Sequence, residues 1–206
     1  MRTQTINPLM VGALLFGGTL GASAQAATVT LIDNFTTGFG SGTTSQSGAG
    51  ILGRRIVDNL GTPLSFQNPG FKWSGNAYNY GTVEYSDFGT LGGTLDLTNT
   101  VLTMTGSGGG TGTANLMVTL FNSNQKSAIW NVGFSNSMTM STSAFTYTDA
   151  GFNLSQVNAI QVMTADNEQA STVNYTMTNF SYAVPAPGAM ALLGVSGLVA
   201  ARRRRS

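Results

Sequence analysis

The 206-residue sequence contains no histidine and no cysteine, and only 8% of its residues are charged. Without histidine or cysteine, the chain cannot build a Ser-His-Asp or Cys-His catalytic set, or a zinc or copper site with histidine ligands. Without cysteine, no disulfide bond can hold the fold, so the packing of its core has to do so. The composition therefore argues against most hydrolase and metalloenzyme classes.

Glycoside hydrolysis needs only two carboxylates, and two acidic pairs deserve consideration for that reason. Glu84 and Asp87 form the first pair, and Asp166 and Glu168 form the second. Residues three apart in one strand face opposite sides of a sheet, which argues against the first pair. Both pairs lie in turn-like contexts where acidic side chains are usually solvated, so we predict that the protein is not an enzyme.

The N-terminus has the three parts of a secretory signal peptide, which we assign to residues 1–26. Arg2 supplies the positive charge, residues 9–22 form an apolar run, and small residues at Ala24 and Ala26 fit the cleavage rule. Cleavage after Ala26 would make Ala27 the first residue of the mature chain, and cleavage after Ala24 is the alternative. An uncleaved membrane-spanning start is the competing interpretation.

The charge of the mature body differs in sign from that of the whole chain. Residues 27–183 hold four basic and eight acidic residues, a net charge of −4, whereas the full chain carries +1. The basic balance therefore comes from the two ends. A mildly acidic body offers no electrostatic surface for nucleic acid, so we expect no nucleic-acid partner.

The body is rich in Thr, Ser, Asn and Gly, a balance that favours strands and tight turns over helices. Short runs with apolar alternation occur at residues 28–35, 51–57, 71–73, 78–85, 94–105, 114–121, 128–134, 145–148, 159–164 and 172–182. Clusters of Gly, Ser and Asn separate them at residues 38–50, 106–112, 122–124 and 136–137. We predict one all-β domain over residues 27–183, an antiparallel, jelly-roll-like β-sandwich. An up-and-down barrel or a short β-solenoid is the alternative.

The glycine-rich residues 106–112 lie between two predicted strands. A phosphate-binding loop would need a helix after it and usually a lysine. The next segment, residues 114–121, has a strand pattern and no lysine. We therefore interpret the glycine-rich stretch as a hairpin loop.

Residues 71–80 contain four aromatic residues and two asparagines. Exposed aromatic faces pack against the C–H groups of sugars while neighbouring amides form hydrogen bonds to the hydroxyls. Trp73, Tyr78 and Tyr80 are accordingly candidates for a glycan-binding platform, since the two tyrosines share one strand face. The alternative is that Trp73 and its aromatic neighbours fill the core.

A structural calcium ion is compatible with the composition. Asp33 together with Asp166 or Glu168 would supply oxygen ligands if the first strand lay beside the last loop. No EF-hand pattern supports such a site, and we expect no other cofactor.

Residues 184–206 have three parts in a fixed order. They are Val184, Pro185, Ala186 and Pro187, then the apolar residues 188–201, then Arg202, Arg203, Arg204 and Arg205. The prolines favour an extended, unpaired backbone that a protease can bind. The apolar run would form a hydrophobic helix that partitions into lipid, with the arginines on the cytoplasmic side. A plain C-terminal membrane anchor is the alternative.

This ending resembles the PEP-CTERM sorting domain of exported bacterial proteins, with Pro185-Ala186-Pro187 in place of the usual Pro-Glu-Pro. The resemblance implies an exosortase-type membrane protease or transpeptidase as partner and transient anchoring in the inner membrane. It also implies a final place at the cell surface, in the outer envelope or in the extracellular polysaccharide of a biofilm. It implies no activity for the body.

We therefore expect an exported, non-catalytic protein of the cell surface or extracellular matrix. The alternative is a secreted carbohydrate-binding module, or a weak glycan-active enzyme, that carries the same sorting segment.

Overall fold

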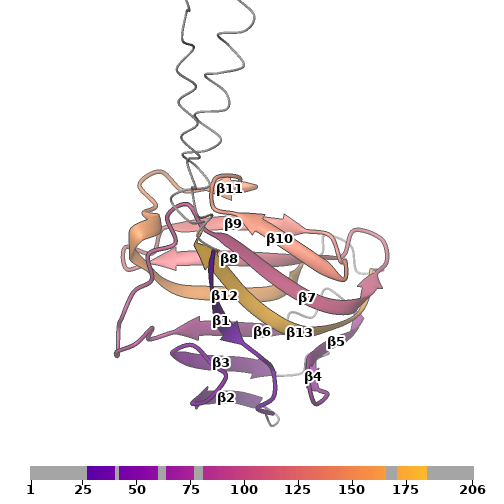
Figure 1. Ribbon diagram of the computed structural model, residues 1–206. Coiled ribbons are helices and arrows are strands. Elements are labelled where there is room, and N and C mark those ends of the chain that lie inside the picture. The colour runs from indigo at the N-terminus through magenta and orange to yellow at the C-terminus, as the bar shows by residue number, and fades with distance from the viewer. Residues whose placement is uncertain (1–26, 40–41, 60–63, 77–80, 166–170, 185–206) are drawn as a thin grey trace, which may run out of the picture.

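The computed structural model describes residues 27–39, 42–59, 64–76, 81–165 and 171–184 (Figure 1). Of the residues singled out from the sequence, those outside these ranges are Ala24, Ala26, Tyr78, Tyr80, Asp166, Glu168, Pro185, Ala186, Pro187, Arg202, Arg203, Arg204 and Arg205. The expectations for cleavage, sorting and anchoring therefore stay predictions. Within the described ranges, no helix combines the length and the apolar character that crossing a bilayer requires.

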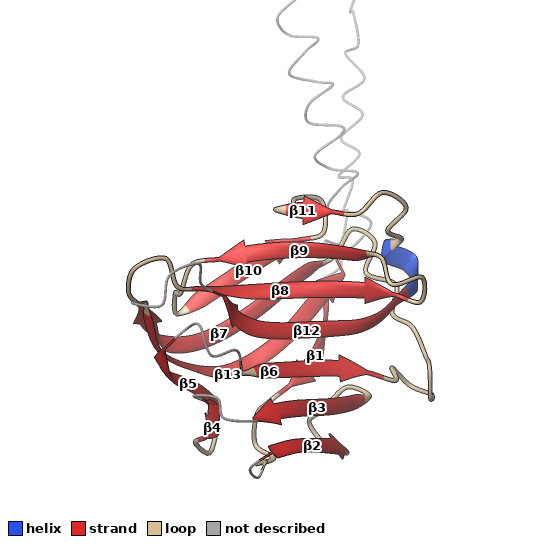
Figure 2. Cartoon of the chain, turned by 180° about the vertical axis from the view of Figure 1, so that it is seen from behind, coloured by secondary structure: helices blue, strands red, loops and turns tan. Residues whose placement is uncertain are grey.

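The described chain folds into two antiparallel β-sheets that pack face to face (Figures 1 and 2). The six-stranded sheet has the order β10 (Ser137–Ser141), β7 (Val101–Gly110), β13 (Thr172–Val184), β5 (Phe71–Asn76) and β4 (Leu64–Phe66), with β1 (Thr28–Asp33) also paired to β13. The seven-stranded sheet has the order β11 (Tyr147–Thr148), β9 (Ser127–Val132), β8 (Asn115–Asn122), β12 (Val157–Ala165), β6 (Thr82–Ser86), β3 (Arg54–Asn59) and β2 (Gly42–Ser47). A short 3-10 turn, η1 (Leu154–Gln156), precedes β12. The prediction of an all-β antiparallel sandwich is confirmed.

The core lies between the sheets, and strand alternation decides which side chains enter it. On β13, Val173, Tyr175, Met177 and Phe180 are buried, as the alternation predicted. A register shift between Met177 and Asn179 moves the alternation by one residue, so that Phe180 still faces inward. A continuous apolar face along β13 lets it form the centre of the six-stranded sheet.

Two strands lie partly in stretches that the sequence assigned to loops. β2 falls within residues 38–50, and its inward positions, Thr44 and Gln46, are polar. β10 begins at Ser137 and buries Met138 and Met140. The run predicted from residue 94 becomes a strand only at Val101, since Asn99 turns the chain with a φ of 54°.

The glycine-rich residues 106–112 are largely a strand, so the prediction of a hairpin loop is wrong. β7 extends to Gly110, and β13 runs so close beside Gly106 and Gly108 that side chains at these two positions would not fit. A Cβ atom on Gly106 would overlap the carbonyl oxygen of Thr176, and one on Gly108 would overlap that of Asn174. Gly108 also has a φ of 109°, which side chains strongly disfavour.

Adjacent glycines in β7 provide a test of this close approach. Gly108→Ala is expected to destabilise the fold by about 2 kcal/mol or more, through strain and overlap together. Gly109→Ala should change stability by less than about 1 kcal/mol, because a Cβ there meets nothing within 4 Å. Urea unfolding of both variants measures the difference, and equal effects would contradict the proposed contact with β13.

A buried ion pair connects the two sheets. Asp33 on β1 and Arg55 on β3 are both fully buried, and Arg55 Nη1 lies 2.7 Å from Asp33 Oδ2. Arg55 Nη2 donates to the carbonyl oxygen of Thr37 at 2.6 Å, and Nε donates to Gln46 Oε1 at 3.1 Å. The guanidinium carbon lies 4.5 Å from the centre of the Phe71 ring. Each nitrogen of the guanidinium therefore has a partner.

Both carboxylate oxygens of Asp33 also have hydrogen-bond partners. Its Oδ2 also accepts a hydrogen bond from the Tyr85 hydroxyl at 3.0 Å, and its Oδ1 accepts one from the backbone N–H of Phe35 at 2.7 Å. Burial raises the pKa of Asp33, against the opposing effect of the Arg55 charge. Asp33 faces the interior with both oxygens engaged, so it is not available as the calcium ligand that the sequence suggested.

Substitution of the neighbouring residues Arg55 and Arg54 compares the stability that a buried ion pair and a surface ion pair contribute. Arg55→Ala leaves Asp33 buried without its counter-ion and should cost about 3–5 kcal/mol of unfolding free energy. Arg54→Ala should cost at most about 1 kcal/mol, because its 2.8 Å ion pair with Asp87 lies at the surface, with the two side chains 42% and 18% exposed. Urea unfolding of the two variants gives the comparison. A loss of less than about 1 kcal/mol for Arg55→Ala would contradict the role assigned to the buried pair.

Candidate functional site

The predicted aromatic platform is not formed by Trp73. This residue is at an inward position of β5 and is fully buried, and its indole N–H donates to the carbonyl oxygen of Gly81 at 2.9 Å. The alternative interpretation, that it fills the core, describes it correctly. Tyr78 and Tyr80 lie outside the described residues.

The acidic pair at Glu84 and Asp87 is divided between two environments. Glu84 is an outward residue of β6, whereas Asp87 follows the strand with a φ of 53°. Asp87 pairs with Arg54 and accepts a hydrogen bond from the backbone N–H of Gly92 at 2.9 Å. Asp87 is therefore engaged in holding the loop after β6.

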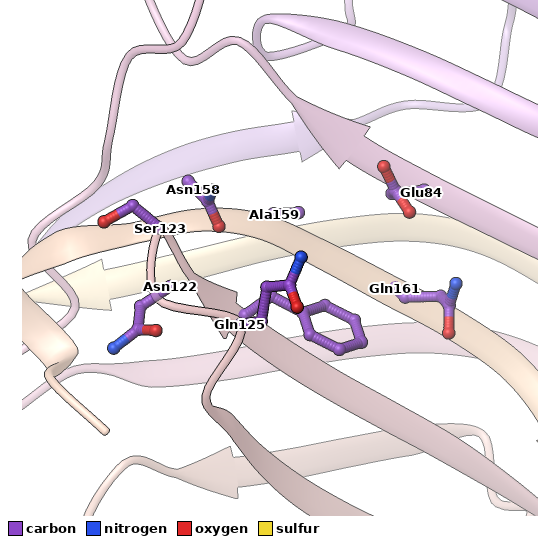
Figure 3. Close-up of a pocket in the computed structure, with 8 residues that line it drawn as sticks. Glu84, Asn122, Ser123, Gln125, Asn158, Ala159 and Gln161 are labelled. Atoms are coloured by element: carbon purple, nitrogen blue, oxygen red, sulfur yellow. The ribbon is translucent and has the colours of Figure 1, made fainter. Parts of the chain in front are cut away.

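A hollow of about 610 Å³ lies on the outer face of the seven-stranded sheet, over β6, β12 and β8 (Figure 3). The residues that line it are Glu84, Phe121, Asn122, Ser123, Gln125, Asn158, Ala159 and Gln161. Most of these side chains carry an amide, hydroxyl or carboxyl group, and one is an aromatic ring. Three strands far apart in the sequence thus contribute to one concave polar surface.

Strand register sets the spacing of the lining side chains. Glu84 on β6 is directly opposite Gln161 on β12, and Ala159 on β12 is directly opposite Phe121 on β8. Directly opposed Cβ atoms in antiparallel strands are about 4.5–5.5 Å apart. The Glu84–Gln161 pair therefore lies next to the Ala159–Phe121 pair on the same face of the sheet.

A β-bulge gives the hollow an additional polar side chain. Val157 is opposite Asn122 and Ala159 is opposite Phe121, so Asn158 is an extra residue in β12. Val157 and Ile160 are buried, and both residues between them line the hollow. Bulges commonly redirect a side chain in this way beside functional sites.

Asn158 Oδ1 is buried and has no hydrogen-bond partner among the described residues. It is the one such atom that belongs to the lining of the hollow. An unsatisfied buried acceptor costs about 1–3 kcal/mol. The fold therefore carries an acceptor without a partner in one of the residues that line the hollow.

The turn between β8 and β9 forms one rim of the hollow. Asn122 Oδ1 accepts hydrogen bonds from the backbone N–H groups of Asn124, at 3.1 Å, and Lys126, at 3.0 Å. Gln125 adopts a φ of 57° within the same turn. The nearly buried Asn122 thus holds the turn so that Ser123 and Gln125 border the hollow (Figure 3).

The hollow is weakly acidic. Glu84 is its one carboxylate, and its lining contains no lysine or arginine. Burial raises the pKa of Glu84, and the charge of Arg54 partly opposes this rise. Among the described residues, no three or more histidine, cysteine, aspartate or glutamate side chains are grouped so that they could hold a metal ion.

The sequence analysis did not single out these residues. The available signal was the break in alternation at Asn158 and Ala159, between the inward residues Val157 and Ile160. Glu84, Phe121 and Gln161 are ordinary outward positions of three separate strands. Only the pairing of β6, β12 and β8 brings them together.

Comparison with protein-family models and with curated proteins finds no match. Among solved structures, the chain is similar to the agarase AgWH50C, with a TM-score of 0.46 and 7% identity over 77% of this chain and 25% of that one. An exo-beta-agarase gives a TM-score of 0.44 and 11% identity, over 76% and 25% of the two chains. The CBM22-1 xylan-binding domain from Paenibacillus barcinonensis Xyn10C gives 0.36 and 13%, over 80% and 99%.

The chain spans about a quarter of the length of the agarase chains that it matches.

Proposed function

We propose that the body of this chain is a non-catalytic, jelly-roll-like carbohydrate-binding module, with the hollow over β6, β12 and β8 as its sugar site. The observation that carries the proposal is the unpartnered Oδ1 of Asn158, the extra residue of the β12 bulge, which lines the hollow. A sugar hydroxyl can donate the hydrogen bond that this acceptor lacks.

The remaining lining supports the same ligand class. The side-chain amides of Gln125, Asn158 and Gln161 each offer donors and an acceptor, which match hydroxyl groups that do both. Phe121 next to Ala159 supplies an apolar surface for sugar C–H groups. A mixed surface of amides around one ring is typical of sites for polar ligands with apolar faces.

Two variants with matched controls test the sugar site. Asn158→Ala and Phe121→Ala should each weaken polysaccharide binding about tenfold, since each loses one hydrogen bond or one stacking surface. The controls are Asn131→Ala, an exposed amide on β9, and Tyr147→Ala, an aromatic ring that is 54% exposed on β11. Affinity electrophoresis and calorimetry against a panel of polysaccharides measure the effect.

The unfolding midpoint of each variant shows whether a loss of affinity comes from the binding site or from a loss of folding. Asn158→Ala removes an unsatisfied buried acceptor, so its unfolding midpoint should hold or rise while its affinity falls. Wild-type affinity in Asn158→Ala and Phe121→Ala, with binding lost in Tyr147→Ala, would place the site elsewhere. Silence of the wild-type protein across the whole panel would refute the proposed function.

We further propose that the protein is exported through its signal peptide and sorted by an exosortase through residues 184–206, toward the cell surface or extracellular polysaccharide. The described body supports this arrangement in one respect. Thr28, at the start of β1, pairs with Val184, at the end of β13, so these two residues lie at the same end of the sandwich (Figure 1).

The processing of both ends gives an independent prediction. The surface-released protein should begin at Ala27 and lack Arg202 to Arg205, because those segments are removed before release. Replacement of all four arginines with serine should leave an unprocessed precursor in the membrane fraction. Intact-mass measurement of the released and membrane fractions decides, and a released protein with its full C-terminus would exclude sorting by this segment.

A further inference from the structure

We propose that Glu84 makes the hollow selective for uncharged glycans, so that it binds neutral polysaccharides and rejects sulfated and uronic-acid ones. This inference rests on the proposed function, because it specifies the ligand class of the same hollow. Glu84 is then a specificity-determining residue rather than a catalytic one.

The position of Glu84 places its charge within the binding surface. It is directly opposite Gln161, whose amide lines the same hollow, and both are labelled side by side in Figure 3. The side chain is only partly exposed. A ligand that contacts Gln161 would therefore lie within reach of the carboxylate.

The surroundings do not supply a dedicated counter-ion for Glu84. Its neighbours across both pairing strands, Gln161 on β12 and Ile56 on β3, are uncharged. Arg54 lies one row away, opposite Ser86, and its guanidinium is paired with Asp87 at 2.8 Å. Among the residues that line the hollow, Glu84 is the one charged side chain.

The carboxylate also costs the fold free energy that an amide would not. Burial raises the pKa of Glu84, which means that the charged form is partly desolvated in the folded protein. A glutamine would bond to sugar hydroxyls with nearly the same geometry and without that cost. The property that glutamate adds is charge, which strengthens hydrogen bonds from neutral hydroxyls and repels anionic substituents.

The test compares each neutral polysaccharide of the panel with its own sulfated derivative. At low ionic strength, the wild-type protein should bind each sulfated derivative about tenfold more weakly than its neutral parent, as expected for like charges about 10 Å apart near a protein surface. Glu84→Gln should reduce that ratio to about threefold or less. The ratio compares two ligands on the same variant, so it reports the effect of charge even if the variant binds the neutral parent more weakly than the wild type does.

Asp96→Asn is the matched control. It removes one negative charge at an exposed loop residue outside the hollow, and asparagine keeps the oxygen that accepts the hydrogen bond of the Thr98 N–H at 2.9 Å. The ratio of its affinities for a neutral polysaccharide and for the sulfated derivative should equal that of the wild type. A similar loss in both variants would mean that net charge, and not Glu84, excludes the anions.

The outcomes separate this inference from the proposed function. Equal or tighter wild-type binding of sulfated derivatives would overturn the charge selectivity and leave the sugar site standing. Full discrimination in Glu84→Gln would overturn the role of this residue, and so would loss of all binding in a variant with a wild-type unfolding midpoint. Failure of the wild type to bind either class would overturn both proposals together.

Discussion

The guanidinium of Arg55 is the interaction on which the arrangement of the two sheets depends. A fully buried charge is tolerated only when it is paired and its donors are used. Arg55 obtains those partners from Asp33 in one sheet and Gln46 in the other. A one-residue slip of β1, β2 or β3 would turn one of these side chains outward. The pair therefore fixes the register of three strands in a chain that has no disulfide bond.

The need of Arg55 for polar partners also explains why the sequence pattern did not predict β2. Alternation detects strands whose inward positions are apolar, and it located β12 and β13 to within a few residues through residues such as Val162 and Tyr175. The inward positions of β2 are instead polar, and Gln46 uses its amide to bond Arg55 and the carbonyl oxygen of Gly38. Its hydrogen-bonding role is evident only once the buried arginine is placed.

Contacts between strands likewise determine the positions of residues for which the local sequence predicted a different structure. Glycine composition favours turns, yet Gly106 and Gly108 pair with β13 as strand residues, and glycine is required there because β13 leaves no room for a side chain. An aromatic cluster favours an exposed platform, yet Trp73 is opposite Tyr175 on an inward row of β5 and β13. The fold class and the principal core strands were predictable from local pattern, whereas these contacts depend on which strands become neighbours.

The two polar clusters of the sandwich differ in a way that bears on their roles. Inside, Arg55 and Asp33 satisfy one another and their neighbours, which stabilises one arrangement of the sheets. On the outer face, Asn158 keeps an acceptor without a partner, and Glu84 remains partly desolvated without a dedicated counter-ion. Both outer features raise the free energy of the empty fold, and both would be relieved by hydroxyl donors placed in the hollow. A rigid interior and a bulged, incompletely satisfied outer face together form a preorganised surface for a polar, uncharged ligand.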